Sequence, residues 1–153
     1  MRRLENRIPP LVTFAVMGAA MWAVARTVPA ANFSLPAGHL LAAALGVAGF
    51  AVATLGVISF RRARTTVNPL QPGAASALVV SGVYRLTRNP MYLGLLLMLA
   101  GWGMYLGHAI ALALSAAYVP LMNRLQIQPE ERALAAKFGP AFAAYQARAR
   151  RWL

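Results

Sequence analysis

Two short polar clusters stand out in an apolar chain, and they contain the side chains best suited to chemistry. The first polar cluster is RLTRNPMY, residues 85–92, and the second is RLQIQPEE, residues 124–131. Together they offer guanidinium groups, an amide, a phenol and two adjacent carboxylates, which bind charged small molecules through ion pairs and hydrogen bonds. The clusters therefore predict a composite binding site if the fold brings them together.

The residue types that are rare or missing argue against several other chemistries. The chain has no cysteine, which excludes disulfides, thiolate metal sites and a cysteine nucleophile. Only two histidines are present, His39 and His108, so we expect no zinc or copper site and no metal. The only carboxylates are Glu5, Glu130 and Glu131, against fifteen Lys plus Arg, and the formal net charge is +12. A nucleic-acid-binding protein can be this basic, but a soluble one would not also be 59% hydrophobic.

The composition instead predicts an all-α membrane protein with about four transmembrane helices. Only 12% of the residues are charged and the mean hydropathy is +0.56, whereas soluble domains carry roughly 25% charged residues. A helix of about 20 apolar residues crosses a bilayer. Residues 8–28 and 38–60 each fit one crossing, and the second segment is rich in Gly and Ala, which permit close helix packing.

The apolar run after the first polar cluster is too long for one span and short for two. We therefore expect a helical hairpin with arms at residues 91–106 and 109–123. The natural place for its tight turn is a group of small residues with one histidine: Gly101, Gly103, Gly107 and His108. Because a hairpin returns the chain to the membrane face where it began, the two polar clusters should be neighbours in space.

The distribution of basic residues predicts the orientation in the membrane. Of the fifteen Lys and Arg residues, only Arg26 lies outside the N-terminal segment, the loop 61–90 and the tail 124–153. The positive-inside rule then places both termini and this loop in the cytoplasm, and we expect the membrane to be a bacterial inner membrane. Topology and attraction to anionic lipid headgroups account for most of the charge without a nucleic acid. The basic N-terminus is similar to that of a signal peptide, but we interpret it as preceding a retained helix.

The tail after the fourth expected span has the signals of short cytoplasmic helices. These are a proline at a first helical position, acidic residues in the first turn, a basic residue in the last and a glycine stop: Pro129, Glu130, Glu131, Lys137 and Gly139. A second segment, residues 140–153, carries aromatic and arginine side chains that suit a membrane interface. We find no repeat and no linker, so residues 1–153 should form one membrane domain.

The polar clusters also carry two ordered motifs. The first motif consists of Gly82, Tyr84, Arg85, Arg88, Asn89, Pro90, Tyr92 and Gly94. After two apolar segments follow Glu130, Glu131, Leu134, Phe138, Gly139, Phe142, Tyr145, Arg151, Trp152 and Leu153. In this order and spacing, residues 65–153 resemble the isoprenylcysteine carboxyl methyltransferase and phospholipid methyltransferase family, which are integral membrane enzymes. Asn89 stands where the eukaryotic members have His, Phe142 replaces a usual Tyr, and Ala149-Arg150 replaces Val-Pro.

The resemblance implies an enzyme that transfers a methyl group from S-adenosylmethionine to a lipophilic acceptor. The acceptor would be an isoprenylcysteine-like carboxylate, a thiol or a lipid headgroup, reached through the bilayer, while the cofactor would enter from the cytosol. Such a transfer needs positioning and electrostatic matching, and neither a metal nor a covalent nucleophile. The implied cofactor-binding residues are Arg88, Asn89, Tyr92, Gly94, Glu130 and Glu131. The implied catalytic residues are Arg124 and Glu131. We expect the loop 61–81 to lie over the site.

Each of these residues also has a purely structural interpretation. The paired glutamates suit a first helical turn, and Asn89-Pro90 suits a helix start in which Asn caps the helix. The basic residues of the clusters suit topology anchors: Arg85, Arg88 and Arg124. Four aromatic residues suit a membrane interface, an interpretation that we favour for the last two: Tyr84, Tyr92, Tyr145 and Trp152.

Two other functions compete with the methyltransferase. A small four-helix transporter or channel subunit is the first, but proton-coupled transport commonly needs ionisable groups within the spans. The four expected spans contain no Asp, Glu or Lys, which argues against it. The second is a noncatalytic lipid-binding scaffold. The sequence does not identify the methyl acceptor or the oligomeric state.

Overall fold

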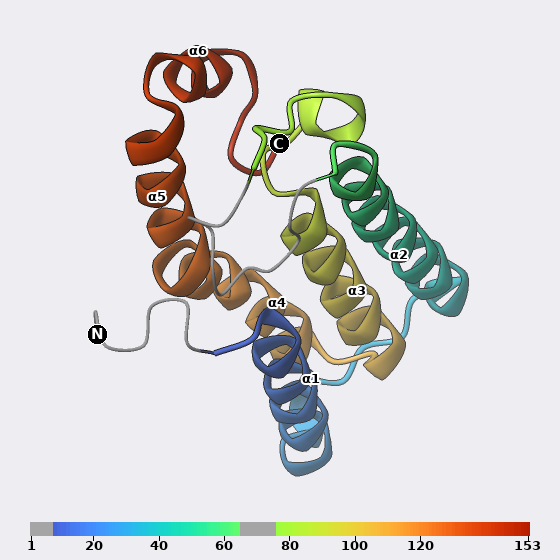
Figure 1. Ribbon diagram of the computed structural model, residues 1–153. Helices are drawn as coiled ribbons and strands as arrows, with labels where there is room; N and C mark the ends of the chain where they lie inside the picture. The colour runs from blue at the N-terminus through green and yellow to red at the C-terminus, as the bar shows by residue number, and fades with distance from the viewer. Residues whose placement is uncertain (1–7, 65–75) are drawn as a thin grey trace.

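The computed structural model describes residues 8–64 and 76–153, and this part of the chain folds into helices and turns without a β-strand (Figure 1). The α-helices are α1 (Pro10–Thr27), α2 (Gly38–Arg62), α3 (Pro90–Leu106), α4 (Ala109–Met122), α5 (Gln128–Phe138) and α6 (Pro140–Arg148). Three shorter helical segments are η2 (Pro29–Ala31), η4 (Gly82–Arg85) and the π-helical turn η5 (Asn123–Ile127). The all-α prediction is therefore confirmed.

The apolar helices begin and end close to the expected membrane spans. Within the described residues, three helical segments are long and apolar enough to cross a membrane: Pro10–Thr27, Gly38–Arg62 and Ala109–Phe138. Helix α3 is apolar but has only 17 residues, so the expected number of four crossings stays a prediction. The basic N-terminal segment and much of the loop 61–81 lie outside the described residues, so neither the signal-peptide interpretation nor the covering loop is tested.

Helices α2 and α3 make the closest approach in the bundle, and glycines permit it. A Cβ atom added to Gly49 would lie 2.5 Å from the carbonyl oxygen of Gly94, and one added to Gly94 would lie 2.4 Å from that of Gly49. Gly101 likewise faces the carbonyl of Ala42 on α2, at 2.8 Å from an added Cβ. The Gly- and Ala-rich composition of the second apolar segment therefore permits close packing, as expected.

The hairpin between α3 and α4 turns at Gly107, whose φ of 57° lies in the left-handed region that favours glycine. The next residue caps α4, because Nδ1 of His108 accepts a hydrogen bond from the N–H of Ala111 at 3.1 Å. The predicted turn is therefore confirmed for Gly107 and His108. Gly101 and Gly103 lie inside α3 instead, where they allow contact with neighbouring helices.

Helix α4 ends at Met122, within one residue of the expected bound, and η5 and α5 follow it without a break, so that Ala109–Phe138 forms one helical segment. The π-helical turn η5 directly precedes α5, which has Pro129 at its start. Pro129 has no N–H to give to the preceding turn and its ring crowds the carbonyl four residues earlier, so regular α-helix is disfavoured here. In Figure 1 this long segment rises beside the start of α3 and leads to α6 above the bundle.

A small second core lies at this end of the molecule and corrects two expectations. Val79, Tyr84, Phe142, Tyr145 and Ala149 pack together between η4 and α6. The side chain of Tyr145 donates a hydrogen bond to the carbonyl oxygen of Tyr84 at 2.8 Å, and Tyr145 is only 5% exposed. The membrane-interface interpretation of Tyr145 is therefore wrong, and so is that of the aromatic face of α6. A buried aromatic core and a membrane interface produce similar sequence patterns, because aromatic side chains next to arginines suit either environment.

Candidate active site

The structure brings the two polar clusters together around a cavity of about 80 Å³. The cavity lies between the starts of α3 and α5 and the aromatic residues of η4 and α6. Its polar lining is Arg88, Asn89, Glu130 and Glu131, and its aromatic lining is Phe60, Tyr84, Tyr92, Phe142 and Tyr145. Sites for small molecules commonly measure roughly 300–1,000 Å³, so the apolar walls must separate to admit a ligand of nucleoside size.

Tyr92 and Glu130 form the deepest polar pair of this site. The phenol of Tyr92 donates a short hydrogen bond to Oε1 of Glu130, and Tyr92 is only 5% exposed. Both residues stand in a first helical turn, Tyr92 in α3 and Glu130 in α5. Glu130 has no cationic partner among the described residues. This carboxyl group is therefore available to a positively charged ligand in the cavity.

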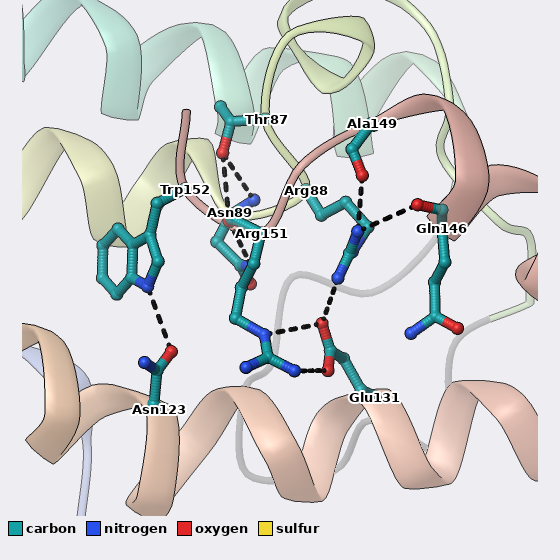
Figure 2. A network of polar contacts seen from close by, with 9 residues as sticks. All are labelled: Thr87, Arg88, Asn89, Asn123, Glu131, Gln146, Ala149, Arg151 and Trp152. Atoms are coloured by element: carbon teal, nitrogen blue, oxygen red, sulfur yellow. Dashed lines mark hydrogen bonds and ion pairs between the residues drawn. The ribbon is translucent and has the colours of Figure 1, made fainter.

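Glu131, in contrast, is fully engaged by two arginines. Arg88 donates from Nη2 to Oε1 at 2.8 Å, and Arg151 donates from Nη2 to Oε2 at 2.6 Å and from Nε to Oε1 at 3.2 Å. Figure 2 shows the two guanidinium groups on either side of this carboxylate. The hydrogen bond to Glu131 raises the pKa of Arg151 above its ordinary value. Glu131 therefore organises the arginines around the cavity.

Arg88 links the cavity to the end of α6. Besides its ion pair, its Nη1 donates to the carbonyl oxygens of Ala149 and Gln146, the latter at 3.3 Å. Its Nε is buried and has no hydrogen-bond partner in the described structure. A buried donor without a partner costs about 1–3 kcal/mol. Arg88, which lines the cavity, therefore keeps one buried donor without a partner, suited to an anionic or carbonyl group that reaches it.

Asn89 precedes α3 as expected, but its side chain does not cap the helix. Its Nδ2 donates instead to the carbonyl oxygen of Arg151 at 2.8 Å. The capping interpretation is therefore wrong for the Asn89 side chain, whereas Pro90 does stand at the first helical position. Since one N–H of the amide is used in this bond, Oδ1 and the second N–H of Asn89 are the groups that can meet a ligand in the cavity that it lines.

Two residues expected in the site lie elsewhere. Gly94 is buried against the backbone of Gly49, so its contact is with α2. Arg124 is exposed in η5 and is not among the residues that line the cavity. Arg151, which joins the site through Glu131, was recognised only as part of a motif. Nothing in the local sequence distinguishes it from its neighbours Arg148 and Arg150.

An apolar groove of about 700 Å³ opens beside the cavity, between the start of α1 and the second half of α2. Met91 and Tyr92 line both the groove and the cavity. The remaining described residues of the groove are mostly aliphatic or aromatic, with Arg61 as the one charged side chain among them: Pro9, Pro10, Leu11, Phe50, Ala53, Thr54, Val57, Ile58, Arg61, Leu95 and Met98. The site therefore has a polar compartment and an apolar one that meet at Tyr92.

Comparison with known proteins gives a family and one relative. A model of the phospholipid methyltransferase family matches residues 37–141, which include both polar clusters. An uncharacterized protein of Haemophilus influenzae is 40% identical over 63 residues, which cover 41% of this chain and 100% of that protein. No solved structure matches the chain significantly. Residues 8–64 and 76–153 contain no group of three His, Cys, Asp or Glu side chains that could hold a metal ion.

Proposed function

Because this chain belongs to the phospholipid methyltransferase family, we propose that its cavity binds S-adenosylmethionine and that its apolar groove holds a lipid methyl acceptor. The observation that carries this proposal is the meeting of the two compartments at Tyr92, whose phenol is hydrogen-bonded to Glu130 in the polar compartment. A membrane methyltransferase needs such a junction, since one substrate is charged and water-soluble and the other is apolar.

The polar lining supports the choice of cofactor. S-adenosylmethionine, when bound, supplies a methyl group activated by a positively charged sulfur. Glu130, which has no cationic partner among the described residues, complements that charge. The buried Nε of Arg88, which has no partner, suits the carboxylate of the cofactor. The aromatic walls of the cavity suit an adenine ring.

The lining of the groove favours a lipid as the acceptor, which would enter sideways from the bilayer. Its lining is apolar, and its outer helices expose large hydrophobic residues, among them Leu11 at 68% and Phe50 at 67%. Arg61 is a charged residue that lines the groove and lies in the last turn of α2. It suits an acidic group near the lipid headgroup, while the alkyl chain lies against Phe50 and Met98.

Glu130 and Tyr92 have a role toward the acceptor as well. A carboxylate or thiolate acceptor needs little help from a base, whereas an amine must lose a proton before or during methyl transfer. The second oxygen of Glu130 is the group best placed to receive that proton, because Glu131 is already held by two arginines. Methylation of lipid carboxylates, thiols and amines should therefore be compared directly.

The competing functions have less support. Helices α1 to α4 contain no Asp, Glu or Lys, which disfavours a proton-coupled transporter. A noncatalytic lipid-binding scaffold has no use for a carboxyl group in a polar cavity next to the groove.

The proposal is tested by calorimetry with S-adenosylhomocysteine and purified protein in detergent. We expect micromolar binding by the wild type, and a loss of affinity in the variant Glu130→Gln that is larger for S-adenosylmethionine than for S-adenosylhomocysteine, whose sulfur is uncharged. Transfer of labelled methyl groups from S-adenosylmethionine to added lipids then identifies the acceptor. Absence of binding in a folded wild-type sample contradicts the proposed cofactor.

A further inference from the structure

The segment after α6 lies across the residues that precede α3, and we call this segment, Ala149–Trp152, the strap. The N–H of Arg88 donates to the carbonyl oxygen of Arg150 at 2.8 Å. The carbonyl oxygen of Arg151 accepts from Asn89 at 2.8 Å and from the hydroxyl of Thr87 at 3.3 Å. Figure 2 shows this segment running beside Thr87 and Asn89, with the Arg151 side chain directed toward Glu131.

The strap is fixed at its far end as well. Nε1 of Trp152 donates to Oδ1 of Asn123 at 3.0 Å, and Asn123 is the first residue of the π-helical turn that leads into α5. The strap therefore connects the start of α3 with the start of α5. These are the two elements that carry the polar lining of the cavity.

None of the strap residues lines the cavity, so the strap can act only through residues that do. It holds Arg88 through the carbonyls of Arg150 and Ala149, and it holds Glu131 through the guanidinium of Arg151. Glu131 in turn fixes Arg88. A carboxylate between two guanidinium groups balances part of their charge and restricts their rotamers.

We propose that Asn89 is a positioning residue that acts through the strap: by fixing the backbone of Arg151, it sets the positions of Glu131 and Arg88 at the cavity. This inference rests on the proposed function, because the consequence is measured as cofactor affinity. The strap itself lies outside residues 37–141, the part of the chain that the family model matches.

The test is a double-mutant cycle on the affinity for S-adenosylhomocysteine, measured by calorimetry on the full chain in detergent. We expect Asn89→Ala and Arg151→Ala each to weaken binding by about tenfold, as the loss of a hydrogen bond to a charged or buried group does. If Asn89 acts through Arg151, the double variant binds within about twofold of the weaker single variant, because the two changes remove one shared interaction. Independent effects, which multiply to about a hundredfold, would show that Asn89 contacts the cofactor directly and would overturn the proposal.

A second measurement needs no cofactor. Hydrogen exchange of the Arg88 amide, whose N–H is donated to the strap, should be about tenfold faster in Asn89→Ala than in the wild type. The variant Asn89→His, which keeps an N–H donor, should restore slow exchange and tight binding. Unchanged exchange in Asn89→Ala would overturn the proposal.

The matched control is Gln146→Ala. Gln146 is exposed and joins the network only through its main-chain carbonyl, so its truncation should leave exchange and affinity as in the wild type. Thermal unfolding of every variant shows that it is folded. If the wild type binds no S-adenosylhomocysteine, the proposed function fails, and the exchange measurement still decides whether Asn89 fixes the strap.

Discussion

The phenol of Tyr92 donates a hydrogen bond to the carboxylate of Glu130 at the place where the polar cavity meets the apolar groove. The two residues are 38 positions apart in the chain, yet each stands in the first turn of its helix. Because Tyr92 borders both compartments and Glu130 lines the polar one, the pair is where a charged cofactor and a lipid headgroup would come together.

Substitution of Glu130 tests the charge of this pair. Glu130→Gln keeps the size of the side chain and removes its negative charge, so affinity for S-adenosylmethionine should fall by at least about tenfold. Affinity for S-adenosylhomocysteine, whose sulfur is uncharged, should fall less, because the substitution removes the attraction between the carboxylate and the sulfonium. Calorimetry measures both. The control is Gln128→Ala. Gln128 is exposed and stands two residues before Glu130, so this variant should bind the cofactor like the wild type.

Substitution of Gly94 tests the contact between α2 and α3. In Gly94→Ala the new Cβ would lie 2.4 Å from the carbonyl oxygen of Gly49 and 2.7 Å from Cβ of Ala53. The helices must separate, which we expect to cost about 1–3 kcal/mol and to lower the unfolding temperature in detergent. Gly46→Ala is the control, because nothing lies within 4 Å of its added Cβ. Equal effects of the two changes would contradict the packing argument.

A bulky residue in the groove should separate lipid binding from cofactor binding. Thr54→Trp fills part of the groove, so methyl transfer to lipid should fall strongly while the affinity for S-adenosylhomocysteine stays within about twofold of the wild type. Val47→Trp changes a 70% exposed position of α2 that does not line the groove. Loss of activity in both variants would show that the groove is not the acceptor site.

Two adjacent arginines test the recognition of the lipid headgroup. Arg61 lines the groove, whereas Arg62 is exposed and does not. Arg61→Gln should raise the KM for an acidic lipid acceptor several-fold and leave kcat nearly unchanged, because it removes an ion pair that is present in the ground state and the transition state. Arg62→Gln should leave both constants unchanged. An equal response of the two variants would indicate general attraction to the membrane surface.

The buried phenol of Tyr145 makes stability depend on alkaline pH. Burial raises the pKa of Tyr145 from 10.0 to about 12. The folded protein therefore keeps this proton at a pH where the unfolded chain loses it, so stability falls as the pH rises from about 10 to about 12. Tyr145→Phe should reduce this dependence and should cost about 1 kcal/mol at neutral pH through the lost hydrogen bond to Tyr84. Tyr105→Phe, at a 57% exposed residue, is the control for thermal unfolding at each pH.

Helix positions were the most predictable feature of this protein. Long apolar runs, Pro90 at the start of α3 and Gly107 at its end are local signals, and each acts within a turn or two of the chain. The predicted arm 109–123 agrees with α4 within one residue, but the π-helical turn that continues the helix into α5 was not predicted. Sequence periodicity does not reveal such a turn, since it depends on how the helix packs.

Within the candidate site, the neighbourhood was predictable but the contacts were not. A hairpin must bring its ends to one face, so the two polar clusters were expected to meet. Which glutamate pairs with arginine, and which with Tyr92, depends on the rotation of α5 against α3. The partner of Asn89 is a main-chain carbonyl 62 residues away, and no side-chain pattern marks a carbonyl.

The sequence by itself determined that this chain forms apolar helices with a polar, basic end, because hydropathy and helix boundaries are properties of short segments. Only the tertiary structure decided that Glu131 serves the arginines while Glu130 remains available, and that Tyr145 is buried instead of lying at a membrane interface. The reason is physical: ion pairs and burial depend on distances between segments remote in the chain, and those distances follow from the packing of the whole bundle.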